Sequence, residues 1–357
     1  MFLKLRIMAV TTAALLFVAF AGLYGSSAQV MPNPATSAAT PTPTPPVTDD
    51  DEVIKIDSEV VNVLFTAQDR NRRLLTSLRQ EDIRVIENGQ VQELVAFSRQ
   101  VDLPLSLAIL IDTSVSQQRT LPEEKAAAIS FLETVMRPSK DEVSIISFTG
   151  ESTLEQGMTN NLVRLRHAID RVKFTPPSGY IGGGVIAGTP PISGGNQAVQ
   201  GSTAIWDSVW VTADEVLGPA PERTRRAIIL LSDGVNTSGK KNLDDAVNAA
   251  LRSEAIIYSI GIGDNFYSGV DKGSLNKISE RTGGRAYFPR DERELRDAFR
   301  QIQEEMRSQY LIAYEPTDQR RDGSYRKIEI QLANQALQKE KVKVTHRQGY
   351  FAKTGSK

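Results

Sequence analysis

The sequence predicts an α/β fold, in which a doubly wound, mostly parallel sheet is inserted between β segments that form a smaller sandwich-like domain. Two patterns carry this prediction. Short, almost wholly apolar runs such as Ser106–Asp112 and Ala227–Ser232 alternate with helical segments, as strands buried on both faces of a parallel sheet do. Before and after this region apolar and polar residues alternate, which is typical of half-buried strands.

The N-terminus has the pattern of an export signal or a membrane anchor. Two basic residues precede an uncharged run over residues 7–24, and small residues follow it up to Ala28. We expect residues 1–28 to be a signal peptide or an N-terminal anchor, so that the protein is exported and periplasmic, secreted or held by this segment. Residues 29–51 are rich in Pro, Thr and Ala and predict an extended linker.

Residues 52–101 are expected to form an N-terminal β module. Val60 to Phe65 is a β-branched run, and the strands Ile83–Ile86 and Leu94–Phe97 flank Asn88-Gly89. Asn-Gly is a strong signal for a two-residue hairpin, because its turn needs a positive φ at both positions. We therefore expect these two strands to form a hairpin.

Residues 102–307 are expected to form the α/β domain. The pattern predicts, in order, strand Ser106–Asp112, helix Leu121–Met136, strand Val143–Phe148, edge strand Thr153–Met158, helices Leu162–Val172 and Ala204–Leu217, strand Ala227–Ser232, a helix capped by Asn242, strand Ile256–Ile262, helix Ser274–Arg281, strand Tyr287-Phe288 and helix Glu292–Arg307. Thr120 and Glu123 fit a capping box. Trp206 and Trp210 lie four apart on one helix face, so we expect both in the core.

Residues 308–353 return to strand patterns, over Gln309–Tyr314, Lys327–Leu332 and Val342–His346. We expect this C-terminal β segment to pack with the module at 52–101. The α/β domain would then be an insertion in one sandwich.

Composition excludes several kinds of site. The 357 residues contain 42 Lys and Arg against 43 Asp and Glu, so net charge gives no reason to expect nucleic acid as a partner. The absence of cysteine excludes disulfides, thiolate catalysis and cysteine-ligated zinc. With His167 and His346 as the two histidines, a histidine-rich metal site or a Ser-His-Asp triad is not expected. We expect His167 to be an exposed helix residue and His346 a structural strand residue, and assign a role to neither.

Oxygen donors cluster where ligands bind in open α/β sheets, beyond the carboxyl ends of the strands. Asp112, Ser114 and Ser116 follow one apolar strand, and Asp233 follows another. Thr203 lies just before the tryptophan helix. Carboxylates and hydroxyls are ligands for a hard cation such as Mg²⁺, and a site with few charges leaves the ion able to bind an outside carboxylate.

These residues resemble the metal-ion-dependent adhesion site of von Willebrand factor A (vWA) domains. Asp112, Ser114 and Ser116 match the DxSxS element of that family, Thr203 its isolated threonine and Asp233 its distal aspartate, whereas Val115 departs from the usual glycine. The resemblance implies Mg²⁺ or Mn²⁺ as the metal, with Ca²⁺ as an alternative, and a protein ligand of unknown identity.

The resemblance extends over about residues 53–353 to the acidobacterial-type vWA-related proteins. It rests on QEDIRVIENGQVQELVAFS before the vWA core, and on TGGRAYF, SQYLIAYEP, DGSYRKIEI and HRQGYF after it. That group implies a fold more than a function.

An exported, metal-dependent protein-binding module is therefore the leading interpretation, and we expect no enzyme activity. The alternatives are a structural envelope component with a stabilising metal, and a Mg²⁺-dependent phosphotransferase. A phosphotransferase of the haloacid dehalogenase type needs a carboxylate at the position of Ser114. Nucleotide is not an expected ligand, because the sequence has no GxxxxGK[ST] loop. A membrane is expected as a partner only through an uncleaved N-terminal segment.

A long connection over residues 178–201 leads into Thr203 and contains eight glycines and no charged residue. Loops of this length in compact domains are usually functional or disordered. We hypothesise that its apolar residues contact a bound partner; the alternative is an insertion without a specific role.

Overall fold

The computed structural model describes residues 60–99, 102–175, 180–181, 184–185, 202–221, 223–263 and 269–355. The predicted signal at 1–28, the linker at 29–51 and most of the 178–201 connection lie outside these residues. The described residues belong to one compact unit. None of their helices is long and apolar enough to cross a membrane.

A six-stranded sheet forms the centre of the α/β region, in the order β12-β11-β10-β5-β6-β7. Five strands are parallel, and the edge strand β7 is antiparallel to β6. The strands are β5 (Leu105–Asp112), β6 (Glu142–Phe148), β7 (Ser152–Thr159), β10 (Arg225–Ser232), β11 (Ala255–Gly261) and β12 (Ala286–Tyr287). This arrangement confirms the predicted doubly wound, mostly parallel sheet.

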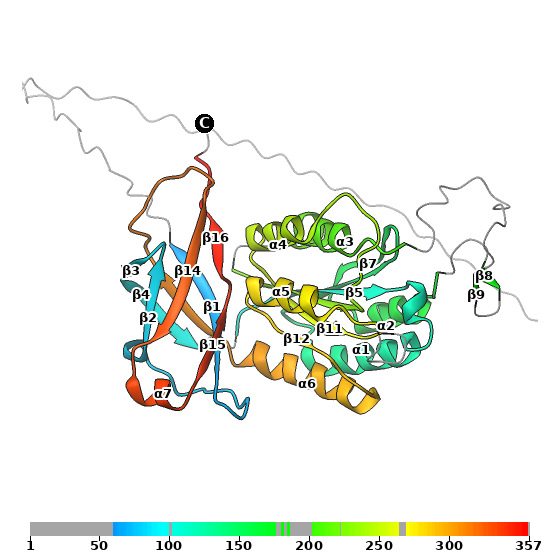
Figure 1. Cartoon of the computed structure of the whole chain (residues 1–357), viewed down its shortest axis with the longest axis horizontal. Coiled ribbons are helices and arrows are strands. Elements are labelled where there is room, and N and C mark those ends of the chain that lie inside the picture. Colours follow the sequence, from blue (N-terminus) through cyan, green and yellow to red (C-terminus); the bar gives the residue numbers. More distant parts are fainter. Residues whose placement is uncertain are drawn as a thin grey trace, which may run out of the picture. The chain divides into compact units, whose positions relative to one another are not determined.

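Helices cover both faces of this sheet (Figure 1). They are α1 (Leu121–Val135), α2 (Leu162–Arg171), α3 (Ile205–Val211), α4 (Leu243–Arg252), α5 (Lys272–Thr282) and α6 (Glu292–Arg307). One core contains side chains of α1, α2 and α6, and a second contains those of α3, α4 and α5. Along β5, Leu107 and Ile109 enter the first core, and Ala108 and Leu110 the second, since successive strand residues point to opposite faces.

Two four-stranded antiparallel sheets combine strands from both sides of the α/β region in the sequence. One has the order β15-β1-β13-β4 and the other β16-β14-β2-β3. The strands are β1 (Val61–Gln68), β2 (Ile83–Glu87), β3 (Gln90–Gln92), β4 (Leu94–Arg99), β13 (Tyr310–Tyr314), β14 (Tyr325–Leu332), β15 (Lys343–His346) and β16 (Gly349–Phe351), with α7 (Gln335–Lys339) before β15. Val63, Phe65, Val85, Ile312 and Ile330 pack together in the core shared by both sheets.

Two local predictions were wrong. Asn88 and Gly89 do form a turn with positive φ, but the turn joins β2 to β3, whereas β4 pairs with β13 in the other sheet. Thr120 forms no capping box with Glu123; its hydroxyl donates to the Glu124 carboxylate, 2.8 Å away. An i,i+4 hydrogen bond along the helix replaces the expected cap.

Other local predictions are confirmed. The Asn242 side chain accepts from the Asp245 backbone N–H at the start of α4. Trp206 is buried as predicted, whereas Trp210 is only half-buried and packs against the same core. The helix of Trp206 continues beyond Val211 as a π-helical segment, Thr212–Leu217. His346 lies in β15, where its Nε2 accepts from the Ile330 N–H, and burial lowers its pKa.

Candidate functional site

The candidate site lies at the carboxyl-terminal edge of the parallel sheet, which we call the rim. β5 ends at Asp112 and its neighbour β10 ends at Ser232, directly before Asp233. The two strands are paired in register as far as Ile111 and Leu231. Parallel pairing therefore brings both carboxylates to the same edge.

Asp112 is fully buried, and its two oxygens have different partners. Oδ1 accepts from the Ser114 N–H at 2.9 Å, and Oδ2 accepts from the Ser232 hydroxyl at 2.7 Å. Burial raises the pKa of Asp112 to about 7; hydrogen bonds from Ser114 and Ser232 oppose this shift, and the charge of Asp233 adds to it. The Ser232 hydroxyl thus ties the ends of β5 and β10 together.

Ser114, Ser116 and Asp233 extend this cluster outward. The hydroxyl oxygens of Ser114 and Ser116 are 3.1 Å apart. Burial raises the pKa of Asp233, and a hydrogen bond from the Ser116 side chain partly opposes the shift. Side-chain contacts thus connect four of the five predicted residues, from Asp112 to Asp233.

Thr203, the fifth residue, is held beside the rim by its backbone. Its N–H donates to the Thr237 hydroxyl at 2.7 Å, and its carbonyl accepts from the N–H groups of Thr237 and Ser238. Asn236 accepts from the N–H of Ile205 at 2.7 Å and so caps α3. The segment after Asp233 therefore positions Thr203 and the start of α3.

Gly234 is needed for this segment to leave the strand. Its φ is +81°, and an added Cβ would lie 2.8 Å from Leu275 Cγ and 2.9 Å from the Asp271 carbonyl oxygen. A larger residue would be strained both by the left-handed backbone and by these contacts.

Two polar residues near the rim, Ser232 and Glu124, were not among the predicted site residues. Ser232 was predicted only as the last residue of its strand, and Glu124 only as part of the helix Leu121–Met136. Glu124 is fully buried on α1, and its Oε2 has no hydrogen-bond partner among the described residues. Burial raises the pKa of Glu124 to about 8, and the charges of Asp112, Glu123 and Asp233 contribute. The i,i+4 spacing of Thr120 and Glu124 was the available signal.

The residues present fit a hard cation by the chemistry of their donors. Two carboxylates and three hydroxyls offer oxygen ligands, and the described residues include no Lys or Arg in an ion pair with Asp112 or Asp233. No group of three or more His, Cys, Asp or Glu suited to a metal ion occurs in the described part of the chain. Any cation here would therefore depend on the hydroxyls as well as the carboxylates.

Comparison with family models identifies part of the chain. Residues 194–301 match the model of the von Willebrand factor type A domain. The chain contains a vWA domain. The match includes Thr203 and Asp233 and begins after the DxSxS segment at 112–116. No curated protein matches the chain.

Solved structures similar to the chain include proximal thread matrix protein 1 from the mussel byssus, with 17% identity and a TM-score of 0.45. That match covers 62% of this chain and 51% of the mussel chain, so this chain spans about half the length of that protein. Another structure of the mussel protein, with a zinc-occupied MIDAS motif, has 18% identity and a TM-score of 0.45, over 62% of this chain and 50% of the other. An aerotolerance-related membrane protein from Bacteroides fragilis has 16% identity and a TM-score of 0.41, over 57% of this chain and 100% of its own.

Proposed function

We propose that the chain is an exported module that binds an acidic group of a protein partner through a divalent cation at the rim. Asp112, Ser114, Ser116, Thr203 and Asp233 would hold the cation, with Mg²⁺ or Mn²⁺ expected and Ca²⁺ as an alternative. The vWA domain supports this proposal, because such domains often mediate metal-dependent protein binding and are mostly non-enzymatic.

The observation that carries the proposal is the continuous set of oxygen donors from Asp112 to Asp233. The two carboxylates are close enough for the charge of Asp233 to raise the pKa of Asp112. Neutral hydroxyls lie between them rather than basic side chains. A divalent ion would neutralise both carboxylates and keep affinity for one more anionic ligand, which a partner would supply.

Export and the division into domains belong to the same proposal. The signal or anchor at 1–28 and the linker at 29–51 would carry the folded part out of the cytoplasm and separate it from the membrane. The β sheets formed by 52–101 and 308–353 would present the α/β region at 102–307. Membership of the acidobacterial-type group also stays a prediction.

Calorimetric titration of Mg²⁺, Mn²⁺, Ca²⁺ and Zn²⁺ into the full chain tests the cation. We expect saturable binding that is lost in Asp112→Ala and kept in Asp170→Ala, because Asp170 is exposed on α2. Binding that survives Asp112→Ala would place the metal elsewhere. If no metal bound at millimolar concentration, cation-mediated recognition would be rejected.

Metal-dependent capture of a protein tests the partner. The immobilised chain is incubated with an envelope extract in Mg²⁺, eluted with EDTA, and compared with Asp112→Ala. A polypeptide held in Mg²⁺, released by EDTA and absent with the variant is the expected result. Saturable metal binding that raises the unfolding temperature, with no such polypeptide, would instead favour a structural envelope component.

A further inference from the structure

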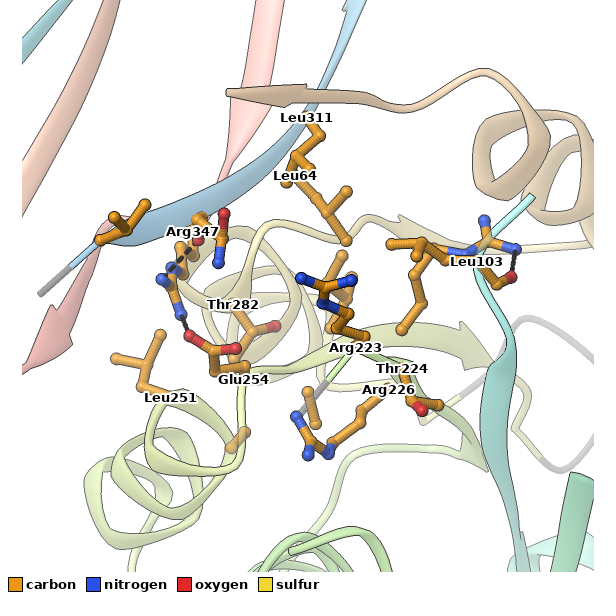
Figure 2. A pocket seen from close by; sticks show the side chains of 16 residues that line it. Leu64, Leu103, Arg223, Thr224, Arg226, Leu251, Glu254, Thr282, Leu311 and Arg347 are labelled. Carbon is orange, nitrogen blue, oxygen red and sulfur yellow. Dashed lines mark hydrogen bonds and ion pairs between the residues drawn. The ribbon is translucent and has the colours of Figure 1, made fainter. Parts of the chain in front are cut away.

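A cavity of about 540 Å³ lies at the edge of the sheet opposite the rim. Arg225 is the first residue of β10 and lines it, whereas Ser232 is the last and belongs to the rim. An eight-residue strand rises about 3.3 Å per residue, so the two places are roughly 23 Å apart. Strands β1 and β13 contribute Leu64 and Leu311 to the cavity wall (Figure 2). The cavity therefore lies between the antiparallel strands and the parallel sheet.

The charged residues that line the cavity are mostly cationic. Arg223, Arg225, Arg226 and Arg347 line it, against the single acidic residue Glu254. Glu254 is already paired with Arg347 at 3.0 Å, as the dashed line in Figure 2 marks. The lining thus carries an excess of three positive charges.

Two of these cations are buried without an ion pair to any described residue. Arg225 donates to the carbonyls of Met306 and Leu103, and Arg226 to those of Leu217, Ala220 and Pro221. These five acceptors are neutral carbonyl oxygens. Buried charges normally require a partner of opposite charge.

Arg225 is the clearest case of a buried cation that lacks an ion pair with an opposite charge on a described residue. It is 8% exposed, and its Nε has no hydrogen-bond partner among the described residues. Burial lowers the pKa of Arg225, the charge of Arg137 adds to the shift, and the attraction of Asp141 only partly offsets it. Asp141 is itself engaged by Arg137, so it does not neutralise Arg225.

Arg347, on the other wall, has an ion pair but also keeps one buried donor without a partner among the described residues. Its side chain is 9% exposed, and it donates to Glu254 and to the Asn62 carbonyl. Its Nε, like that of Arg225, has no partner in the described part of the chain. Two buried donors therefore belong to residues that line one cavity.

We propose that this cavity binds a small organic anion that carries a carboxylate on an aliphatic or aromatic body. Guanidinium groups bind carboxylates through paired, charge-assisted hydrogen bonds. The remaining wall includes the apolar side chains of Leu64, Leu103, Leu251, Ile256 and Leu311, which would cover the body of the ligand. The volume is within the range of small-molecule sites.

Arg223 is the arginine best suited to a test. It is exposed, and Figure 2 shows it among the side chains that line the cavity. Unlike Arg225 and Arg347, it has no hydrogen-bond partner among the described residues, so its replacement should leave the protein folded. Leu64 is half-buried on the wall, and a tryptophan there would fill the space.

The experiment is calorimetric titration of decanoate and 4-phenylbutyrate into the full chain in EDTA. The matched amides of both acids and inorganic phosphate serve as comparison ligands. The variants are Arg223→Glu and Leu64→Trp, with Arg84→Glu as an exposed control on β2. Asp112→Ala is included because the rim plays no part in this proposal.

Saturable binding of at least one carboxylate is expected. The matched amide should bind at least about tenfold more weakly than the acid. Binding of the acid should weaken at least about tenfold in Arg223→Glu and in Leu64→Trp, but not in Arg84→Glu or Asp112→Ala. The proposal is overturned if neither carboxylate binds at millimolar concentration, or if an amide or phosphate binds as tightly. It is also overturned if both cavity variants keep the original affinity.

Discussion

The two edges of the parallel sheet differ in the sign of their buried charge. At the rim, Asp112 and Asp233 are buried, and neither forms an ion pair with a described lysine or arginine. At the opposite edge, Arg225 and Arg226 are buried and donate to carbonyls rather than to carboxylates. A ligand of opposite charge would neutralise the buried charges at each edge: a cation at the rim and an organic anion at the opposite edge.

Asp141 is a carboxylate in the same fold whose charge is neutralised by an arginine of the chain, Arg137. Asp141, directly before β6, accepts from Arg137 Nε and Nη2 at 2.9 and 2.8 Å and from the Leu105 N–H at 3.0 Å. Its pKa is lowered, because these hydrogen bonds more than offset its burial. The pKa of Asp141 therefore falls beside its arginine partner, whereas the pKa values of Asp112 and Asp233, which have no ion pair with a described residue, rise.

The largest predicted effect is the pH dependence of stability that Glu124, a buried carboxyl near the rim, should cause. Its pKa is raised to about 8, whereas an unfolded glutamate has a pKa near 4.3. Because the folded protein binds this proton more tightly, stability is greatest below about pH 4.3 and falls until about pH 8. The loss is on the order of 5 kcal/mol. Glu124→Gln should remove most of this slope.

Urea unfolding in EDTA at pH 5 and pH 8.5 measures this change. Glu133→Gln is the control, because Glu133 is exposed on the same helix. If Glu124→Gln and Glu133→Gln showed the same pH slope, a buried, protonated carboxyl at Glu124 would be ruled out.

Repeating patterns allowed much of the fold to be predicted from the sequence. The apolar runs that became β5 and β10 are buried along their whole length, so their pattern specified a parallel sheet. The partner of β4 was not predictable, because Asn88-Gly89 fixes a turn but not how far the returning strand extends. β3 ends at Gln92, and β4 crosses to the other sheet.

The candidate site was predicted in part, because strand ends determine where Asp112 and Asp233 meet. Ser232 and Glu124 were missed, since their importance depends on contacts between elements rather than on a local pattern. The cavity was missed for the same reason. Arg225 and Arg347 are far apart in the sequence, and no spacing relates them.

Gly234→Ala should be the next largest effect, at about 3 kcal/mol of lost unfolding free energy. The added Cβ would meet the Asp271 carbonyl, and the φ of +81° is unfavourable for alanine. Gly89→Ala is the matched control, since its φ is +87° but nothing lies within 4 Å of the added Cβ. We expect the control to lose only about 1 kcal/mol. Equal losses in urea unfolding would contradict the crowding at Gly234.

Two variants, one at each edge of the sheet, test whether the edges bind their ligands independently. Asp112→Ala should weaken Mn²⁺ binding about a hundredfold and leave decanoate binding unchanged. Arg223→Glu should weaken decanoate binding about tenfold and leave Mn²⁺ binding unchanged. The double variant, measured by the same titrations, should show both losses independently, because roughly 23 Å separate the sites. A loss of both ligands in either single variant would contradict two separate sites.

Asp141→Asn should destabilise the protein by about 2 kcal/mol at pH 7, since it removes a charged acceptor from Arg137. The pKa of Asp141 is lower in the folded protein than in the unfolded chain, where it is near 3.9. The stabilisation is therefore complete above about pH 3.9 and is lost as the pH falls through the pKa of the folded protein. The difference between the two proteins in urea unfolding should therefore shrink from pH 7 to pH 3. Asp170→Asn, at an exposed position, should show no such difference. If the difference in unfolding free energy between the original protein and Asp141→Asn stayed constant with pH, the loss would not come from the charge of Asp141.

The smallest effect is expected beside the rim, where the segment after Gly234 meets α3. Lys241 Nζ lies 4.2 Å from the centroid of the Trp210 ring, and its N–H donates to Asp207. Lys241→Met keeps the apolar stem and the backbone donor but removes the cation, so about 0.5 kcal/mol of unfolding free energy should be lost. Lys339→Met, at an exposed position on α7, should lose nothing measurable. An equal result for both variants would show that the contact of Lys241 with the Trp210 ring contributes no measurable stability.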